Sequence, residues 1–295
     1  MNIWKIKPVD ISYEESIPVI NAMEENLTLD ETQLDYVQPL PASYSEAYKK
    51  FKFRRTIKRK NVVNKIFKKK GALRVLDIGG GDPLRKNAPY LDLIKNYMEL
   101  YFALDPSDGA WASVSSSNGI DILKKSKNPE IRFIKGVAEN IPLEANSFDL
   151  IMMMSSLDHC LDANLVLKEC HRLLKPEGEL FIDLTNHSSI YKRLERKIFK
   201  KKAQKRRLQT NKEHNYYLNP SELESMLINK GFTQIQKNTF QFVPEQISFL
   251  LTKYKISWVL PLWLLIVIDS FLSILFKESG GLMHVTGIKS PDVAN

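Results

Sequence analysis

The stretch "LRVLDIGGGDPLRK", residues 73–86, places three consecutive glycines directly after a short apolar segment. That segment, residues 73–78, has the length and composition of a buried β-strand. A glycine-rich turn after the first strand of an α/β unit lets the backbone approach a ligand closely. The stretch therefore predicts a strand, a tight turn that binds a ligand, and a helix for which Pro83 would be a suitable first residue.

Two well-known glycine-rich turns do not fit this stretch. The P-loop requires Lys and then Ser or Thr after its last glycine, and no such pair follows here. The dinucleotide fingerprint G-x-G-x-x-G fails at its third glycine, because Leu84 stands there. A third pattern remains, an acid followed by glycines over residues 77–81, and a plain tight turn without a ligand is the alternative.

Further strand-like segments alternate with helical patterns along the chain. They lie at residues 100–104, 131–135, 148–154, 179–185, 233–242 and 282–290. Helical patterns cover about 163–175 and 219–231, and Asn219 is a plausible N-cap for the second. This alternation predicts an α/β fold with a parallel sheet that helices cover on both faces. Apart from Asp149, residues 148–154 are apolar, so apolar side chains would point to both faces of the sheet, as expected for a central strand.

The basic residues are concentrated in two segments. Residues 49–70 contain 12 Lys and Arg and no acid, and residues 192–213 contain 11 Lys and Arg and two acids. Such segments suit the phosphates of nucleic acid, of lipid or of a pyrophosphate-bearing substrate, and solvated helix faces are the alternative. The presence of two cysteines, which we do not expect to pair, and the lack of an apolar run at the N-terminus predict a cytoplasmic protein without a signal peptide.

One apolar segment, residues 256–276, is long enough to span a bilayer, although Pro261 and Asp269 interrupt it. A single crossing is inconsistent with the return of the chain into the sheet at residues 282–290. We therefore expect residues 243–277 to form a hydrophobic helical insert that lies in the membrane interface or covers the active site. Burial in the protein or in a dimer contact is the alternative.

Four segments in the expected order resemble the class I S-adenosylmethionine-dependent methyltransferases, in the subgroup that includes ubiquinone and menaquinone methylases. They are "VLDIGGGDP", "LYFALDPS", "GVAENIPLEANSFDLIMMMSSLDHCLD" and "LKECHRLLKPEGELFI". The resemblance covers about residues 71–240 and the last strand. It implies a Rossmann-like, doubly wound, seven-stranded sheet with the last strand antiparallel, in a methyltransferase domain at 71–295. Residues 1–70 would then be an N-terminal helical extension that ends in the basic helix.

The resemblance also implies that S-adenosyl-L-methionine is the cofactor, and it assigns the binding residues. The acid and glycines of the first turn would hold the methionine part, Asp105 the ribose hydroxyls, and Ala138 and Glu139 the adenine. The implied cofactor-binding residues are Asp77, Gly79, Gly80, Gly81, Asp105, Pro106, Ala138, Glu139, Ser155 and Ser156. No metal is expected.

Three histidines, His159, His187 and His214, are candidate catalytic residues, because each would serve as a base or position the acceptor. His159 is the first choice, and a hydrogen-bonded structural role is the alternative for each.

We expect an enzyme that methylates a small or lipid-linked acceptor, a surface-glycan precursor or an isoprenoid, at the cytoplasmic membrane face. The basic segment 185–218 would be lid-like and meet anionic lipid. The alternatives are an RNA or protein methyltransferase that uses the basic segments, and a non-catalytic cofactor-binding regulator.

Overall fold

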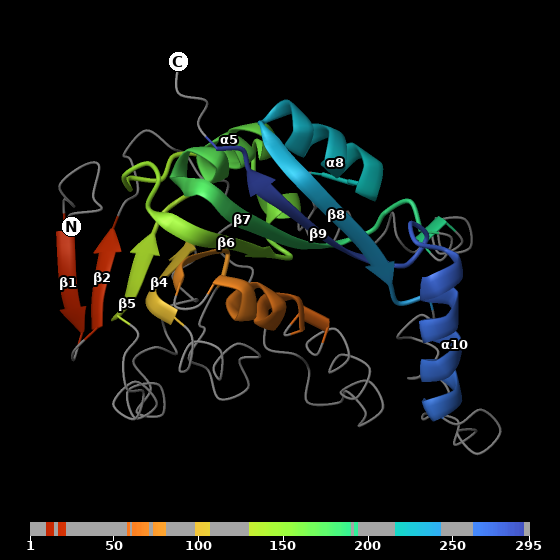
Figure 1. Ribbon diagram of the computed structural model, residues 1–295. Helices are drawn as coiled ribbons and strands as arrows, with labels where there is room; N and C mark the ends of the chain where they lie inside the picture. The colour runs from red at the N-terminus through yellow and green to blue at the C-terminus, as the bar shows by residue number, and fades with distance from the viewer. Residues whose placement is uncertain are drawn as a thin grey trace, which may run out of the picture.

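The described residues of this computed structural model form an α/β fold with one mixed sheet and helices on both of its faces (Figure 1). The structure describes residues 10–14, 17–21, 58–59, 61–70, 73–80, 98–106, 130–189, 192–193, 216–242 and 262–291. Gly81, His214 and most of the segments 1–70, 185–218 and 243–277 lie outside these residues. The predicted boundary between an extension at 1–70 and a domain at 71–295 stays a prediction.

The sheet is built from nine strands in the part of the chain that the structure describes, in the order β1-β2-β5-β4-β3-β6-β7-β9-β8. Their bounds are Asp10–Glu14 for β1, Ile17–Asn21 for β2, Leu73–Ile78 for β3, Met98–Asp105 for β4, Glu130–Lys135 for β5, Phe148–Met154 for β6, Leu174–Thr185 for β7, Phe232–Phe240 for β8 and Leu282–Lys289 for β9. The six strands from β2 to β7 pair in parallel. β1 pairs antiparallel with β2, and β9 runs antiparallel to both of its neighbours.

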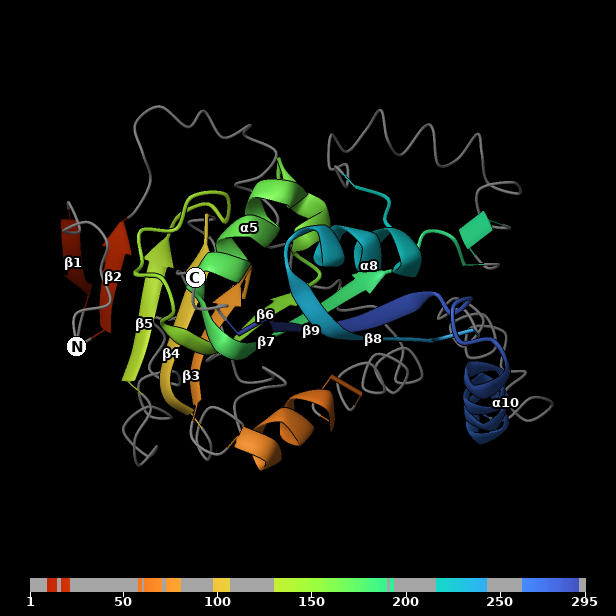
Figure 2. The ribbon, with the colours of Figure 1, turned by 45° about the horizontal axis from the view of Figure 1, so that its top comes forward.

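Helices cover this sheet from two sides. α5 (Ala163–Leu173) and α8 (Pro220–Asn229) lie on one face, and the helical residues 58–59 and 61–70 lie on the other (Figures 1 and 2). Asn219 caps α8 in a capping box with Glu222, which confirms the predicted start of that helix. A short 3₁₀ helix, η2, covers Leu157–His159, and α10 covers Leu262–Leu275.

The Rossmann-like α/β fold is thus confirmed, but two details of the prediction differ from the structure. The sheet has nine strands rather than seven in the described residues, because β1 and β2 extend its β5 edge (Figure 2). The expected helical extension is wrong for residues 10–21, where "DISYE" and "IPVIN" carry the β-branched and aromatic residues that favour strands. Of the insert predicted at 243–277, the structure describes residues 262–277, including α10. No helix among the described residues is long and apolar enough to cross a membrane.

The core has a layer on each face of the sheet, and β6 contributes to both. Ile151 and Met153 pack with α5 and α8, while Leu150 and Met152 pack with the helix at 61–70. This confirms that residues 148–154 form a central strand, in which Met152 and Met153 are completely buried and Met154 is partly buried. Cys160 and Cys170 are not joined in a disulfide, as expected.

A buried ionic cluster ties the N-terminal helical residues to the sheet. Asp183, which is completely buried at the end of β7, pairs through one oxygen with Arg59. Its other oxygen lies 2.7 Å from Nε2 of His284, on the neighbouring strand β9. Arg59 also donates to the hydroxyl of Ser155 at 3.0 Å, just after β6. Asp183 therefore connects the helical residue Arg59 with β7 and β9, and Arg59 extends this connection to the end of β6.

We predict that Asp183→Asn lowers the free energy of unfolding by about 3 kcal/mol, because it removes the charge that compensates a largely buried guanidinium. Urea unfolding followed by circular dichroism measures this change. The matched control is Glu144→Gln, which changes an exposed carboxylate and should leave the midpoint unchanged. Equal midpoints for the two variants would contradict the role given to Asp183.

Candidate functional site

The candidate site lies at the carboxyl edge of the parallel strands. β3 has β4 on one side and β6 on the other, so the direction of the strand order changes at β3. Open α/β sheets bind ligands outside the carboxyl ends of the strands at such a point. Gly79, Asp105 and Ser155 stand at the carboxyl ends of β3, β4 and β6, respectively. The structure thus brings the predicted turn and two further predicted residues to one edge.

The glycine turn is held in place by its neighbours. Gly79 has a φ of 71°, which favours glycine, and its N–H donates to the carbonyl of Leu104 at 2.7 Å. A Cβ at Gly79 would collide with the Cβ of Ser156. The Ser156 hydroxyl donates to the carbonyl of Ile78 at 2.7 Å. Ser156, which we expected to bind the cofactor, therefore supports the turn from the end of β6.

Asp77 is a buried carboxyl group directly beneath this turn. Tyr101 donates its hydroxyl to Oδ2 at 2.6 Å, and a Cβ at Gly80 would come 2.7 Å from that oxygen. Oδ1 is buried and has no hydrogen-bond partner among the described residues. Burial raises the pKa of Asp77 to about 7, although the Tyr101 hydrogen bond and the charge of Arg59 lower it and Asp105 raises it further.

The unsatisfied oxygen of Asp77 indicates a ligand. Buried carboxyl oxygens almost always have a donor, and one without a donor carries a desolvation penalty. An ammonium group beside Oδ1 would supply the missing donor and also favour the ionised form. The amino group of an amino-acid ligand has this chemistry.

Asp105 ends β4, Pro106 follows it, and both are half-buried at the same edge. The backbone carbonyl of Asp105 accepts a hydrogen bond from Gly136 at 3.3 Å, which joins the loops after β4 and β5. Ala138, in the loop after β5, is buried. The predicted contacts of these residues with ribose and adenine remain predictions.

Glu139 has a structural partner that the sequence did not indicate. Its Oε1 accepts hydrogen bonds from the backbone N–H of Leu161 at 2.7 Å and of Asp162 at 3.3 Å. Asp162 is in turn the N-cap of α5. The Glu139 carboxylate therefore fixes the chain that enters α5, and its predicted place along the adenine remains a prediction.

Two of the three candidate histidines lie in described loops at this edge. His159 ends η2, is 23% exposed, and its Nε2 lies 3.9 Å from Oδ1 of Asp158. His187 follows β7, is half-buried, and packs edge-on against Tyr217 with 4.8 Å between ring centroids. His214 lies outside the described residues.

Residues 216–218 connect the loops that carry these two histidines. The N–H of Tyr216 donates to the carbonyl of Asp158 at 3.4 Å, and its hydroxyl donates to the carbonyl of Leu161 at 3.0 Å. The N–H of His187 donates to the carbonyl of Leu218 at 3.3 Å. The described end of the predicted lid-like segment therefore lies beside both loops.

Sequence reasoning missed four residues around the site, Tyr101, Arg59, Asp183 and His284. Asp183 and His284 each interrupt an apolar strand-like run, and a polar residue in such a run is the available signal. Arg59 was hidden among the many cations of its basic segment. Their pairing depends on the register of β7 with β9, which no local pattern reveals.

Comparisons with known proteins agree with this geometry. Residues 76–182 match the family model of a methyltransferase domain. It is 26% identical over 91 residues to a ubiquinone/menaquinone biosynthesis C-methyltransferase of Campylobacter jejuni, which covers 31% of this chain and 39% of that protein. It is 33% identical over 114 residues to a demethylmenaquinone methyltransferase of Thermotoga maritima, or 37% and 42% of the two chains.

The chain thus spans about two fifths of the length of these curated relatives. Among solved structures, a putative sarcosine dimethylglycine methyltransferase of Galdieria sulphuraria shares the fold, with a TM-score of 0.51 and 16% identity over 84% of this chain and 91% of that chain. The resemblance to methyltransferases of the ubiquinone/menaquinone type is therefore confirmed. No group of three metal-ligating side chains occurs among the described residues.

The cofactor prediction fits Asp77, whose unsatisfied Oδ1 suits the amino group of the methionine part. Because the Asp77 carboxyl has a pKa of about 7, its ionised fraction increases between pH 5.5 and pH 7. We therefore predict that the affinity for S-adenosyl-L-methionine rises about tenfold over this interval. Isothermal titration calorimetry at several pH values measures it.

Two variants sharpen this measurement. Asp77→Asn should bind weakly and with little pH dependence. Tyr101→Phe removes the hydrogen bond that lowers the pKa of Asp77, so the rise should shift to higher pH. An affinity of the unmodified protein that stays constant from pH 5.5 to pH 7 would contradict a contact between Asp77 and the amino group.

Proposed function

We propose that this protein transfers a methyl group from S-adenosyl-L-methionine to an isoprenoid or another lipid-linked acceptor at the cytoplasmic face of a membrane. The observation that carries the proposal is the buried Asp77 beneath the glycine turn, with Oδ1 lacking a described donor. The acceptor class is supported by the names of the quinone-pathway relatives.

The cofactor supplies a methyl group on a positively charged sulfur, which leaves as a neutral thioether. The task of the protein is therefore mainly alignment, which can supply on the order of 7–11 kcal/mol of the barrier. Asp77 would accept a hydrogen bond from the ammonium group of the cofactor, and Asp105 would accept hydrogen bonds from its ribose hydroxyls. Ser155, at the end of β6, would face the methionine part and the acceptor, with its hydroxyl fixed by Arg59.

The two described histidines would act on the acceptor. A hydroxylated ring must lose a proton before its oxygen or an adjacent carbon attacks a methyl group, and histidine accepts protons near neutral pH. His159 is partly exposed and follows the end of β6, so it is the first candidate for this base. His187 is the second candidate, and its contact with Tyr217 suggests a role in positioning.

Two other functions keep some support. The basic segments 49–70 and 192–213 would suit an RNA or protein substrate through its negative charges. A regulator that binds the cofactor without transferring its methyl group would need the same Asp77 and glycine turn. A surface-glycan precursor is a second lipid-linked acceptor, for which the relatives offer no support.

We predict that Asp105→Ala lowers the affinity for S-adenosyl-L-methionine at least about thirtyfold, because two hydrogen bonds to a carboxylate would be lost. Calorimetry measures this change, and Glu144→Ala, which removes an exposed carboxylate, is the control. Unchanged affinity in Asp105→Ala would remove the assigned ribose contact.

The acceptor is tested by incubating the protein with methyl-labelled cofactor and a cell lysate that is then separated into lipid, aqueous, RNA and protein fractions. We expect the label in the lipid fraction, in a molecule with an isoprenoid chain. Label in the RNA or protein fraction would instead establish the corresponding alternative. Cofactor binding without label in any fraction would favour the regulator.

A further inference from the structure

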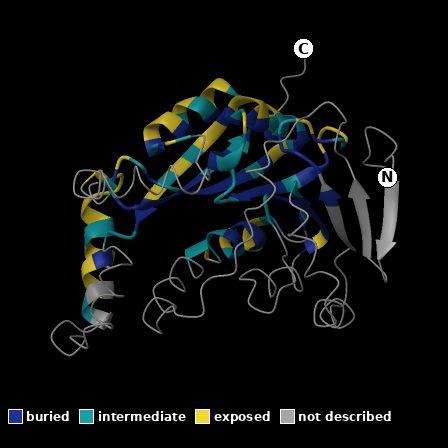
Figure 3. Cartoon of the chain, turned by 180° about the vertical axis from the view of Figure 1, so that it is seen from behind, coloured by how far each residue is buried: buried dark blue, intermediate teal, exposed yellow. Residues whose placement is uncertain are grey.

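The helix α10 buries its one acidic residue against the protein and exposes large apolar side chains. Asp269 is only 2% exposed and accepts a hydrogen bond from the N–H of Phe242 at 2.5 Å. In contrast, large apolar side chains on the same helix are exposed, as the yellow residues of α10 in Figure 3 show. They are Val267 (54%), Ile268 (37%), Phe271 (59%), Ile274 (71%) and Leu275 (56%).

These exposed residues form one continuous face. Their spacing of three, four and seven positions places them on one side of a helix, opposite Asp269. A helix on the surface of a protein in water normally has the reverse arrangement, with its apolar side inward. Contiguous exposed apolar surface of this kind marks an interaction site.

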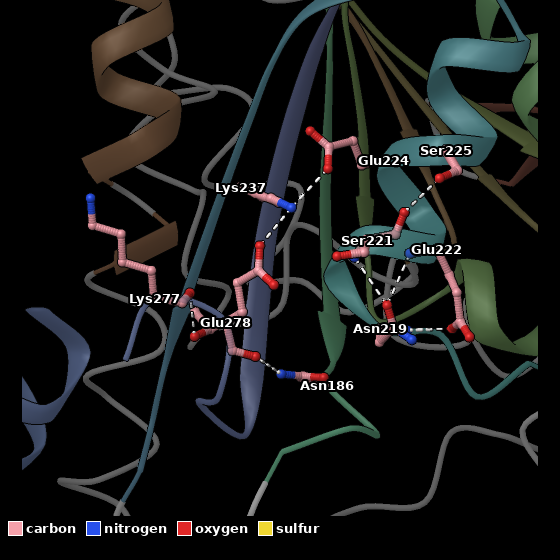
Figure 4. Close-up of polar contacts among 10 residues, drawn as sticks. Asn186, Asn219, Ser221, Glu222, Glu224, Ser225, Lys237, Lys277 and Glu278 are labelled. Atoms are coloured by element: carbon pink, nitrogen blue, oxygen red, sulfur yellow. Dashed lines mark hydrogen bonds and ion pairs between the residues drawn. The ribbon is translucent and has the colours of Figure 1, made fainter. Parts of the chain in front are cut away.

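The residues that follow α10, from Lys277 to Gly280, are hydrogen-bonded to the sheet and to the residue after β7. The side chain of Asn186, just after β7, donates to the carbonyl of Glu278 (Figure 4) and to the carbonyl of Gly280, each at 2.8 Å. The hydroxyl of Thr239, near the end of β8, donates to the carbonyl of Lys277 at 2.7 Å. An added Cβ at Gly280 would come 2.5 Å from the backbone nitrogen of Phe240. The segment that follows α10 is therefore in close contact with the end of β8.

These residues after α10 lie at the same edge of the sheet as the candidate site. Leu282 begins β9 and pairs with Thr185 at the carboxyl end of β7 and with Phe240 at the end of β8. α10, which precedes β9, therefore leaves the sheet at the carboxyl edge, where Ser155 also lies. A surface that binds α10 would face this edge.

Cations of the chain indicate what would bind α10. Lys277 lies two residues after the end of the helix, and the segment 192–213, with 11 Lys and Arg and two acids in the sequence, begins six residues after Asn186. The backbone N–H groups of Lys192 and Arg193, its first two residues, are anchored to Ser189. A protein that combines an exposed apolar helix face with a strongly basic segment has the two features that bind the acyl and phosphate layers of an anionic lipid surface.

We propose that the outward apolar face of α10 docks into an anionic lipid surface and thereby turns the carboxyl edge of the sheet toward the membrane. The inference rests on the proposed function, since a lipid-linked acceptor would be reached from this edge. The 14 residues of α10 extend about 21 Å, against the roughly 30 Å of a bilayer core. The helix would therefore lie in the interface.

The test is flotation of the purified full chain with two kinds of vesicle, phosphatidylcholine alone and phosphatidylcholine with phosphatidylglycerol. The double variant F271S/I274S places polar groups on the apolar face, and Ile228→Ser, on α8 and 58% exposed, is the matched control. We expect the unmodified protein and the control to float with the anionic vesicles. The double variant should partition at least about tenfold less.

Two results would overturn the docking surface. One is equal flotation of the double variant and the unmodified protein, or no flotation of either. The other is a dimer of the unmodified protein, detected by light scattering, that the double variant abolishes, because a second copy would then cover the face. Equal urea midpoints for the double variant and Ile228→Ser show that the fold is intact.

A separate measurement distinguishes this failure from failure of the proposed function. Cofactor affinity, measured by calorimetry without vesicles, should be the same in the double variant and in the unmodified protein. If the unmodified protein floats with anionic vesicles but binds no S-adenosyl-L-methionine, the proposed function fails and the docking surface remains. If it binds the cofactor but F271S/I274S floats normally, the docking surface fails alone.

Discussion

The carboxylate of Asp183 is the interaction on which the arrangement of this molecule depends. It is completely buried, and its two oxygens are paired with Arg59 from the N-terminal helical residues and with His284 from the last strand. Its backbone carbonyl also accepts a hydrogen bond from Ser155 at 2.7 Å. A buried charge tolerates little displacement of its partners, so this group fixes elements that are far apart in sequence relative to the edge where the cofactor would bind.

The sequence predicts the local parts of this structure well and the long-range parts poorly. The strand at 73–78 and its glycine turn are encoded in neighbouring residues, because strand composition and a positive φ are local properties. The cluster of Arg59, Asp183 and His284 joins three distant segments, and only the assembled sheet brings them together. The strands β1 and β2 were not predicted, because each spans only five residues and so gives a weak periodic signal.

The candidate site shows the same division. The family resemblance assigns cofactor contacts to Ser156 and Glu139, and the structure adds a second duty to each side chain. Ser156 holds the backbone of the turn, and Glu139 holds the entry to α5. Asp77 differs, since one of its buried oxygens has no described partner. Burial and unpaired hydrogen-bonding capacity thus separate residues that support a site from those that would touch its ligand, a distinction that a sequence motif alone does not make.

The close packing of Gly280 against the backbone of β8 has a consequence for how catalysis would proceed. Because the residues after α10 are anchored to the sheet in this way, a protein docked through α10 would hold one orientation while it diffuses along the membrane. Enzyme and acceptor would then meet by a search in two dimensions. The rate of turnover would follow the mole fraction of acceptor among the lipids, and adding inert lipid at constant acceptor would slow the reaction by dilution within the surface.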